Sequence, residues 1–291
     1  LDGDWYRLAI PAEALEFGQR TAVRVWEEIA AALLRKYLER LYKLHKQQWD
    51  ERTLGYAPLG ENDPNLLGVG EGTADPYYAI EYDASDTAWL KKLEELKAIV
   101  LSKKARAWEF GNLKAVMCEQ HLFWPLLSVS QGAVTVTPVG LNDGERQFVD
   151  DLRAFHDREP AFFRGSQLYL LRNLSRGRGL GFFEAGNFYP DFIVWQVVGP
   201  TQYVAFVDPK GVRHLDWDDP KLQFSETIRE IEARLGDASV HLSSFIVSNT
   251  PSRDMTAHWR ATKAEMTARN VLFQHEDTDT YIRTLLTAAK G

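Results

Sequence analysis

The chain has 291 residues, of which 45% are hydrophobic and 26% are charged. This length allows about two domains of ordinary size, and the composition is that of globular proteins, which excludes disorder over most of the chain. The net charge of -7 excludes a surface that is basic as a whole, so a polyanionic partner would have to meet a local basic patch or bound metal ions.

The single cysteine, Cys118, excludes an internal disulfide and indicates a reducing compartment, so we expect a cytoplasmic protein. No apolar stretch approaches the roughly 20 residues that span a bilayer, and no membrane partner is expected. The first residues, Leu1 to Trp5, lack the basic and apolar regions of a signal peptide and include no initiator methionine. We therefore expect the sequence to be a piece of a longer polypeptide, or a trimmed one.

Helical spacing of apolar residues predicts a mainly helical first domain, over residues 1–130. One long helix is expected from residue 12 to about 50, with charged residues between the apolar ones. A loop rich in Gly, Pro, Asn and Asp follows at 55–76. Asp86 is predicted to cap a second helix, and a helical pattern resumes over 113–122.

Strand-like and helical segments alternate in a second predicted domain, over residues 131–291. Strands are expected at 133–137, 167–171, 180–184, 192–198, 203–207 and 240–247. Asn142 or Asp143 can cap a helix that runs to about residue 157, and further helices are expected from Asp219 and from Pro251. The order of helix, three or four strands, helix and strand predicts an α/β layer structure.

The strands at 192–198 and 203–207 are apolar nearly throughout, which is typical of strands covered on both faces. Gly199-Pro200-Thr201-Gln202 can join them as a four-residue hairpin loop. In that case Val198 pairs with Tyr203, and this pair sets the register of the whole hairpin.

Charged residues cluster at the open end of this predicted hairpin. Counting from the loop places Asp191 opposite Lys210 and Ile193 opposite Asp208, so Asp191, Asp208 and Lys210 share one face. Cross-strand and diagonal neighbours lie roughly 5–8 Å apart. Two carboxylates at that spacing can bind Mg²⁺, and a lysine beside them can orient water or stabilise charge on a phosphate. The pattern therefore predicts a metal-dependent site for phosphodiester hydrolysis.

A structural interpretation of the same residues stays open. Asp208-Pro209-Lys210-Gly211 fits a type I turn, with Asp first, Pro second and Gly fourth. Tyr189-Pro190-Asp191 can also simply start a strand, where proline is tolerated.

Two runs of sequence together resemble the PD-(D/E)xK nuclease superfamily: Asn187-Phe188-Tyr189-Pro190-Asp191-Phe192 and Phe206-Val207-Asp208-Pro209-Lys210-Gly211. More narrowly, they are similar to the C-terminal nuclease region of type III restriction enzymes and related DEAD/DEAH-box helicase–nuclease proteins. The resemblance covers about residues 142–250. More weakly, the helical first half resembles the region between motor and nuclease in those proteins.

The resemblance implies a restriction-endonuclease-like mixed sheet flanked by helices and preceded by a mainly helical domain. It implies that Asp191 and Asp208 bind Mg²⁺, or Mn²⁺ in its place, and that Lys210 is catalytic. The family often adds a glutamate on the preceding helix, and Glu145 fits that position. Asp208 stands where the family more commonly has Glu, which its pattern allows. The implied activity is that of an endonuclease acting on DNA in a restriction or defence system. Its implied partners are a helicase motor in the same longer chain or complex and further subunits.

Glu145 has a second interpretation, because acidic residues favour the first turn of a helix through the helix dipole. Metal binding and dipole stabilisation both stay open for it. Glu184, on a neighbouring predicted strand, could also reach the site, although a solvated edge position is the plainer alternative.

Basic residues near the predicted site are candidates for contacts with DNA. Arg172, Arg176 and Arg178 lie in or beside a glycine-rich segment that can approach phosphates closely, and His214 follows Lys210 by four residues. Their structural alternatives are a solvated hairpin turn and a surface histidine.

Two other functional classes remain as alternatives at this stage. The domain could be a catalytically inactive nuclease fold that binds nucleic acid or a partner protein, or a scaffold whose long amphipathic helix docks on a partner. The sequence contains no G-x-x-x-x-G-K-[ST], so any motor must lie outside these residues.

Overall fold

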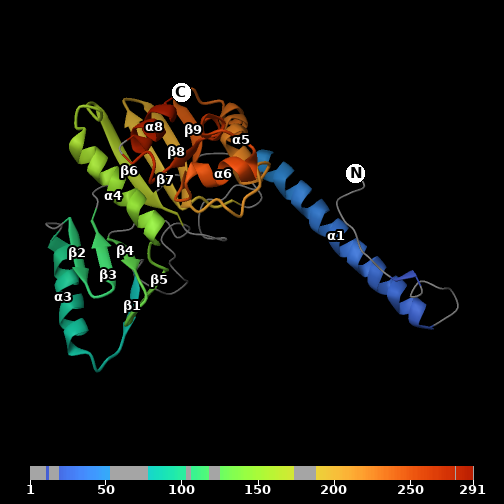
Figure 1. Ribbon diagram of the computed structural model, residues 1–291, viewed down its shortest axis with the longest axis horizontal. Helices are drawn as coiled ribbons and strands as arrows, with labels where there is room; N and C mark the ends of the chain where they lie inside the picture. The colour runs from blue at the N-terminus through green and yellow to red at the C-terminus, as the bar shows by residue number, and fades with distance from the viewer. Residues whose placement is uncertain are drawn as a thin grey trace. The chain divides into compact units, whose positions relative to one another are not determined.

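The structure is a computed structural model that describes residues 11–12, 20–52, 78–102, 106–117, 125–173, 188–278 and 280–290. The chain forms two compact units, Leu1–Tyr56 and Ala57–Gly291. Figure 1 shows the described elements in chain order, from blue at the N-terminus to red at the C-terminus.

The first unit contains one long helix, α1 (Arg20–Arg52). Helix α1 contains no glycine or proline to interrupt it, and apolar residues recur along it at helical spacing. This confirms the predicted long helix over the described part of 12–50, whereas the predicted loop at 55–76 lies outside the described residues. No helix in the described parts of the chain is long and apolar enough to cross a membrane.

Residues 78–137 of the second unit form two small sheets and one helix. The elements are β1 (Ala79–Tyr82), α3 (Thr87–Ser102), β2 (Ala107–Phe110), β3 (Leu113–Val116), β4 (Leu126–Val129) and β5 (Val134–Thr137). Strands β2, β3 and β4 form an antiparallel sheet, and β5, beyond the predicted domain boundary at residue 130, pairs with β1. Asp86 caps α3 as predicted, because its Oδ1 accepts a hydrogen bond from the Ala88 N–H at 3.0 Å.

The predicted helix over 113–122 is wrong at its start, where the chain forms β3. Leu113 and Ala115 are buried while Lys114 between them is partly exposed, which is the period of two that a strand gives. Residues 118–124 of that prediction lie outside the described residues. The part of the first predicted domain that follows α1 is therefore mixed helix and strand rather than mainly helical.

The rest of the second unit is built on a five-stranded sheet in the order β10-β9-β8-β7-β6. Its elements are α4 (Asp143–Arg158), β6 (Ser166–Arg172), β7 (Phe192–Val198), β8 (Thr201–Lys210), α5 (Pro220–Leu235), β9 (Val240–Ser248), α6 (Ser252–Trp259), α7 (Lys263–Ala268), β10 (Val271–Phe273) and α8 (Tyr281–Ala288). Strands β6, β7 and β8 are antiparallel, and β8, β9 and β10 are parallel.

Most predicted elements of this region are confirmed, including the strands at 133–137, 167–171, 192–198 and 240–247. Asp219 caps α5, with its Oδ1 accepting from the Lys221 N–H at 2.9 Å. The three-residue strand β10 interrupts the region after Pro251 that was predicted to be helical. The strand expected at 180–184 lies outside the described residues.

Helices cover both faces of the large sheet (Figure 1). On one face, Phe148 of α4 and Leu285 of α8 pack in a core with Phe192 of β7. On the other face, Phe224 of α5 packs in a core with Phe206 of β8. The alternation of strand residues between these two cores explains why the strands are apolar on both sides. The protein is thus mixed α/β with several sheets, as its sequence predicts at that level.

The β7–β8 hairpin is tighter than predicted. Val198 pairs with Thr201 rather than with Tyr203, so the loop is the two-residue Gly199-Pro200. Gly199 has a φ of 58°, and proline fixes φ near −65° at the next position, which is the combination of a type II′ turn. The predicted register is therefore wrong by two residues.

Candidate metal centre and active site

Asp191 and Asp208 lie next to each other at the open end of the β7–β8 hairpin. Phe192 pairs with Val207 in the observed register, so Asp191 continues opposite Asp208 rather than opposite Lys210. A shift of two residues leaves every side chain on its predicted face, whereas a shift of one would reverse the faces. The prediction that Asp191, Asp208 and Lys210 share a face therefore holds despite the wrong register.

The segment after Asp208 continues a strand and does not turn back. Asp208, Pro209 and Lys210 pair with residues of the parallel strand β9, which extends β8 beyond the end of β7. Pro209 is tolerated because the pairing of β7 with β8 ends at Phe192 and Val207, so Pro209 has no partner in β7. The type I turn that was the structural alternative for this segment is wrong.

Lys210 stands beside the aspartate pair. Its Nζ donates a hydrogen bond to Asp208 Oδ2 and lies 5.2 Å from the ring centroid of Phe188. Its position two residues after Asp208 on one strand brings the two side chains to the same face. The ammonium is thus held by a carboxylate on one side and an aromatic ring on another.

The aspartates are crowded and mostly removed from water. Only 5% of the surface of Asp208 is exposed. Burial, followed by the charge of Asp208, raises the pKa of the Asp191 carboxyl to about 9. A buried and a half-buried carboxyl this close do not both ionise at neutral pH without another cation, and the proton on Asp191 supplies the missing charge.

A count of the charged side chains around the two aspartates also shows that positive charge is missing. Three acids, Glu145, Asp191 and Asp208, interact with one another, whereas two cations, Arg172 and Lys210, interact with them. With all five ionised the cluster carries one uncompensated negative charge in a buried place. A bound divalent cation would remove that deficit and displace the proton of Asp191.

Glu145 lies at the third position of α4 and forms a capping box with Asn142. Its Oε1 accepts a hydrogen bond from Asn142 Nδ2 at 2.6 Å, and its Oε2 accepts one from the Asn142 backbone N–H at 3.2 Å. The helix-start interpretation is thus confirmed. Yet capping alone does not explain why its side chain is only 12% exposed and ion-paired to Arg172. Burial, more than any other cause, raises the pKa of the Glu145 carboxyl.

The donor set fits Mg²⁺, which usually takes one or two carboxylates and completes its shell with water and substrate oxygens. Asp191 and Asp208 supply those two carboxylates. Among the residues that the structure describes, no three His, Cys, Asp or Glu side chains come close enough to form a metal-binding group. Of the three predicted metal ligands, the structure therefore brings Asp191 and Asp208 together as a pair, and Glu145 lies outside that pair.

The predicted DNA-binding residues have different surroundings. Arg172 is buried, with 9% of its surface exposed, and pairs with Glu145. His214 is exposed in the segment after β8, as expected for a residue that could meet a ligand or only water. The other predicted residues near the site lie outside the described residues: Arg176, Arg178 and Glu184.

Two exposed arginines that the sequence analysis did not single out lie in the segments that follow β8 and β9. Arg213 contacts Asp254 of α6 through its Nη2 at 2.6 Å, which brings the segment after Lys210 against the start of α6. Arg253, the neighbour of Asp254 on that helix, keeps most of its side chain in water. Both arginines pair with Asp254, and with His214, the sequence neighbour of Arg213, they form an exposed group that we call the α6 patch. Only its proximity in space, and no motif, identifies it.

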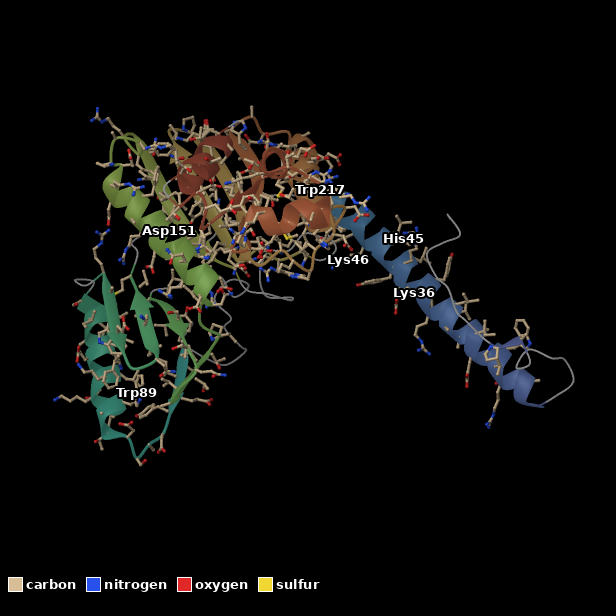
Figure 2. All side chains as sticks on the ribbon, in the orientation of Figure 1. Lys36, His45, Lys46, Trp89, Asp151 and Trp217 are labelled. Atoms are coloured by element: carbon tan, nitrogen blue, oxygen red, sulfur yellow. The ribbon has the colours of Figure 1, made fainter. Side chains whose placement is uncertain are left out.

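Contacts from the C-terminal part of the chain fix the start of α4. Gln274 Nε2 donates a hydrogen bond to the Gly144 carbonyl at 3.1 Å. On the same helix, Asp151 accepts a hydrogen bond from the Tyr281 hydroxyl at 2.7 Å; Figure 2 labels Asp151 on α4. Both contacts join residues 130 positions apart, so no local sequence signal could have predicted them. They hold Glu145 at a fixed place beside the sheet.

No known family model, curated protein or solved structure matches the chain. A functional assignment must therefore depend on the chemistry of this chain's own residues and on the short motif resemblance described above.

Proposed function

We propose that the chain is a Mg²⁺-dependent endonuclease that hydrolyses phosphodiester bonds of DNA. One observation supports this above the others. A buried aspartate, Asp208, and a half-buried one, Asp191, lie side by side with a lysine at the end of a hairpin, and the cluster around them lacks one unit of positive charge. In this proposal Asp191 and Asp208 bind the cation, and Mn²⁺ can replace Mg²⁺. Glu145, in the first turn of α4, is a third acid that interacts with the pair through its charge and lies outside it.

Each residue of the site has a different role in the proposed reaction. When bound, Mg²⁺ supplies a water of lowered pKa and offsets charge on the phosphate. The Lys210 ammonium is placed to donate hydrogen bonds to the attacking water or to a phosphate oxygen, where negative charge grows in the transition state. Phe188 restricts where that ammonium can move, because the ring lies against it. The surrounding core excludes bulk water, which strengthens these charge interactions.

The same proposal extends to partners. The motif resemblance favours a nuclease region that works with a helicase motor, in the same longer chain or in a complex of a restriction or defence system. The exposed cations of the α6 patch could meet DNA phosphates beside Lys210 even though the net charge of the chain is -7.

The test is a cleavage assay with Mg²⁺ and Mn²⁺ on single- and double-stranded DNA and RNA. The wild-type chain should cut DNA, and Asp208→Ala should abolish cutting because the cation loses half of its protein ligands. Lys210→Ala should lower kcat by about 10²–10³-fold, the loss typical of one charge-stabilising donor.

A matched control is Asp277→Ala, which breaks another aspartate–lysine pair, the 2.8 Å contact with Lys263, away from the site. That variant should cut normally. Full activity in folded Asp208→Ala would remove the assignment. DNA binding without cleavage by the wild-type chain would instead favour an inactive nuclease fold.

A further inference from the structure

Arg172 is placed to act on Glu145 rather than on DNA. Its Nη2 lies 3.7 Å from Glu145 Oε2, and only about a tenth of each side chain is exposed, 11% for Arg172 and 12% for Glu145. A guanidinium buried to this extent has little surface left for a phosphate. Removing one partner of a buried ion pair leaves an uncompensated charge, so each of the two residues constrains the other.

The other side of the Arg172 guanidinium meets a tyrosine from a distant part of the chain. Arg172 Nη1 donates towards the Tyr78 hydroxyl at 3.4 Å, across 94 residues of sequence. Tyr78 immediately precedes β1 and packs against two hydrophobic clusters, one around the large sheet and one around the small sheets. The small sheets therefore supply a side chain that reaches the neighbourhood of the candidate site.

Glu145 is consequently held from two directions. Asn142, at the start of α4, donates hydrogen bonds to both carboxylate oxygens. Arg172, at the end of β6, approaches one of these oxygens from the sheet. Without Arg172 the Glu145 carboxylate would keep only its hydrogen bonds with Asn142. Among the residues that the structure describes, no other ion pair would hold its charge beside Asp191 and Asp208.

We propose that Arg172 and Tyr78 are positioning residues, which fix the carboxylate of Glu145 beside the aspartate pair and thereby make the small sheets part of the active site. This inference rests on the proposed nuclease function. The order of action is Tyr78 on Arg172, Arg172 on Glu145, and Glu145, through its charge, on Asp191 and Asp208. Outer partners of metal ligands commonly have such a role, and their loss costs roughly 10–100-fold in metal affinity or activity.

Two variants that preserve charge test the inference. Arg172→Lys keeps the positive charge but cannot reach Tyr78 and Glu145 at once, and Tyr78→Phe removes a hydroxyl that hydrogen-bonds both Arg172 and the backbone of Leu127. Neither variant alters the net charge near the cation. A changed affinity for Mn²⁺ therefore shows that the positions of the side chains around the cation have changed. The Mn²⁺ dissociation constant should rise about 10-fold for Arg172→Lys. It should rise about two- to tenfold for Tyr78→Phe, the equivalent of one neutral hydrogen bond.

Kinetics and DNA binding separate positioning from substrate contact. At subsaturating metal, kcat should fall in both variants while KM for DNA stays unchanged, and saturating Mn²⁺ should restore much of the loss. The double variant should be no worse than Arg172→Lys alone, because Tyr78 acts through Arg172. DNA affinity in metal-free buffer, and its dependence on salt, should match wild type.

Two further variants serve as controls. Tyr169→Phe removes a tyrosine hydroxyl on β6 that hydrogen-bonds only Gln167 among the described contacts. Arg106→Lys weakens the bidentate pair with Asp157, which joins the small sheets to α4 without touching Glu145. Neither control should change the Mn²⁺ dissociation constant.

The outcomes that overturn the inference are distinct. Additive losses in the double variant would show that Tyr78 does not act through Arg172. A weaker salt dependence of DNA binding by Arg172→Lys would make Arg172 a phosphate contact. An equal effect of Arg106→Lys would assign the loss to docking of the small sheets. If the wild-type chain binds Mn²⁺ but cuts no nucleic acid, the nuclease proposal fails, while the Mn²⁺ affinities still decide the inference.

Discussion

Asp191 determines the charge state of the candidate site in the metal-free protein. Its carboxyl has a pKa of about 9 in the fold, chiefly because of burial and then because of Asp208. In the unfolded chain the same carboxyl ionises near pH 4. Between these values the folded protein binds one more proton than the unfolded chain, so the contribution of Asp191 to stability falls as pH rises from about 4 to about 9.

Asp191→Asn should therefore stabilise the metal-free protein. The amide carries no charge at any of these pH values. The variant therefore lacks the loss of stability that ionisation of Asp191 causes as pH rises. We expect its free energy of unfolding to exceed that of wild type by about 1–3 kcal/mol at pH 8, with a gap that grows from pH 4 and levels off above pH 9. Chemical denaturation over a pH series in chelator measures this. A gap that stays constant with pH would contradict the assigned protonation of Asp191.

Individual site residues differ in how far the sequence reveals them. Asp191, Asp208 and Lys210 are predictable because they follow or precede apolar strands in one hairpin, and alternation fixes their face. The role of Arg172 is not predictable, because its surroundings depend on Glu145 from α4 and on Tyr78 from the small sheets. A basic residue beside a glycine-rich segment gives no signal of burial in the sequence.

At the scale of elements, the hairpin loop shows where local sequence rules are weak. Gly199-Pro200-Thr201-Gln202 fits a four-residue loop, but the chain turns at Gly199-Pro200 and uses Thr201 as a strand residue. The longer pairing adds hydrogen bonds, and only the glycine at positive φ is needed for the tighter turn. The face of each residue is more robust than its exact partner, because an error of two residues leaves the face unchanged.

For strand β3, by contrast, the predicted secondary structure is wrong, because the spacing of its apolar residues was interpreted as helical. A four-residue segment fits both a helical and a strand pattern, and only its partners β2 and β4 decide the outcome. Similarly, β10 has three residues and exists because it pairs with β9. Short elements of this kind depend on tertiary contacts that sequence periodicity does not contain.

The cap of α4 should matter to activity as well as to stability. Asn142→Ala removes the side chain that holds one oxygen of Glu145 and should cost about 1 kcal/mol of stability, as N-cap losses usually do. It should also lower kcat more than this loss of stability explains, because Glu145 becomes less well positioned. Thermal unfolding and steady-state cleavage measure the two effects.

The chain contains a matched control for this prediction. Thr262 and Glu265 form a second capping box, at the start of α7. Thr262→Ala should cost a similar free energy of unfolding and leave kcat unchanged. Equal kcat values for the two cap variants would show that the cap of α4 serves the helix alone.

At the scale of the whole molecule, the proposed function requires an acidic protein to approach an acidic polymer. The net charge of -7 repels DNA at long range, so binding depends on local cations and on the metal. In the α6 patch, Arg213 and Arg253 are exposed cations and His214 is an exposed histidine, and Arg213 and His214 follow Lys210 closely in the chain. In the proposed function, this patch is the part of the surface that contacts DNA phosphates.

Arg213→Ala combined with Arg253→Ala should raise KM for DNA and leave kcat nearly unchanged. Each arginine that contacts a phosphate contributes about 0.9 to the slope of log affinity against log salt, so the slope should fall by up to about 2. Binding measured by fluorescence anisotropy at several salt concentrations gives this slope. An unchanged slope would place the DNA-binding surface elsewhere.

The central claim is that the pair of Asp191 and Asp208 is a cation site, and a Mn²⁺ titration by calorimetry at pH 7 tests it most directly. In two buffers that differ in ionisation enthalpy, the heats should show about one proton released per bound ion, because Asp191 must lose its proton. Asp191→Asn should eliminate this proton release, and Asp208→Asn should weaken binding strongly. Folded protein that binds no Mn²⁺, or binds it equally well in both variants, would contradict the claim.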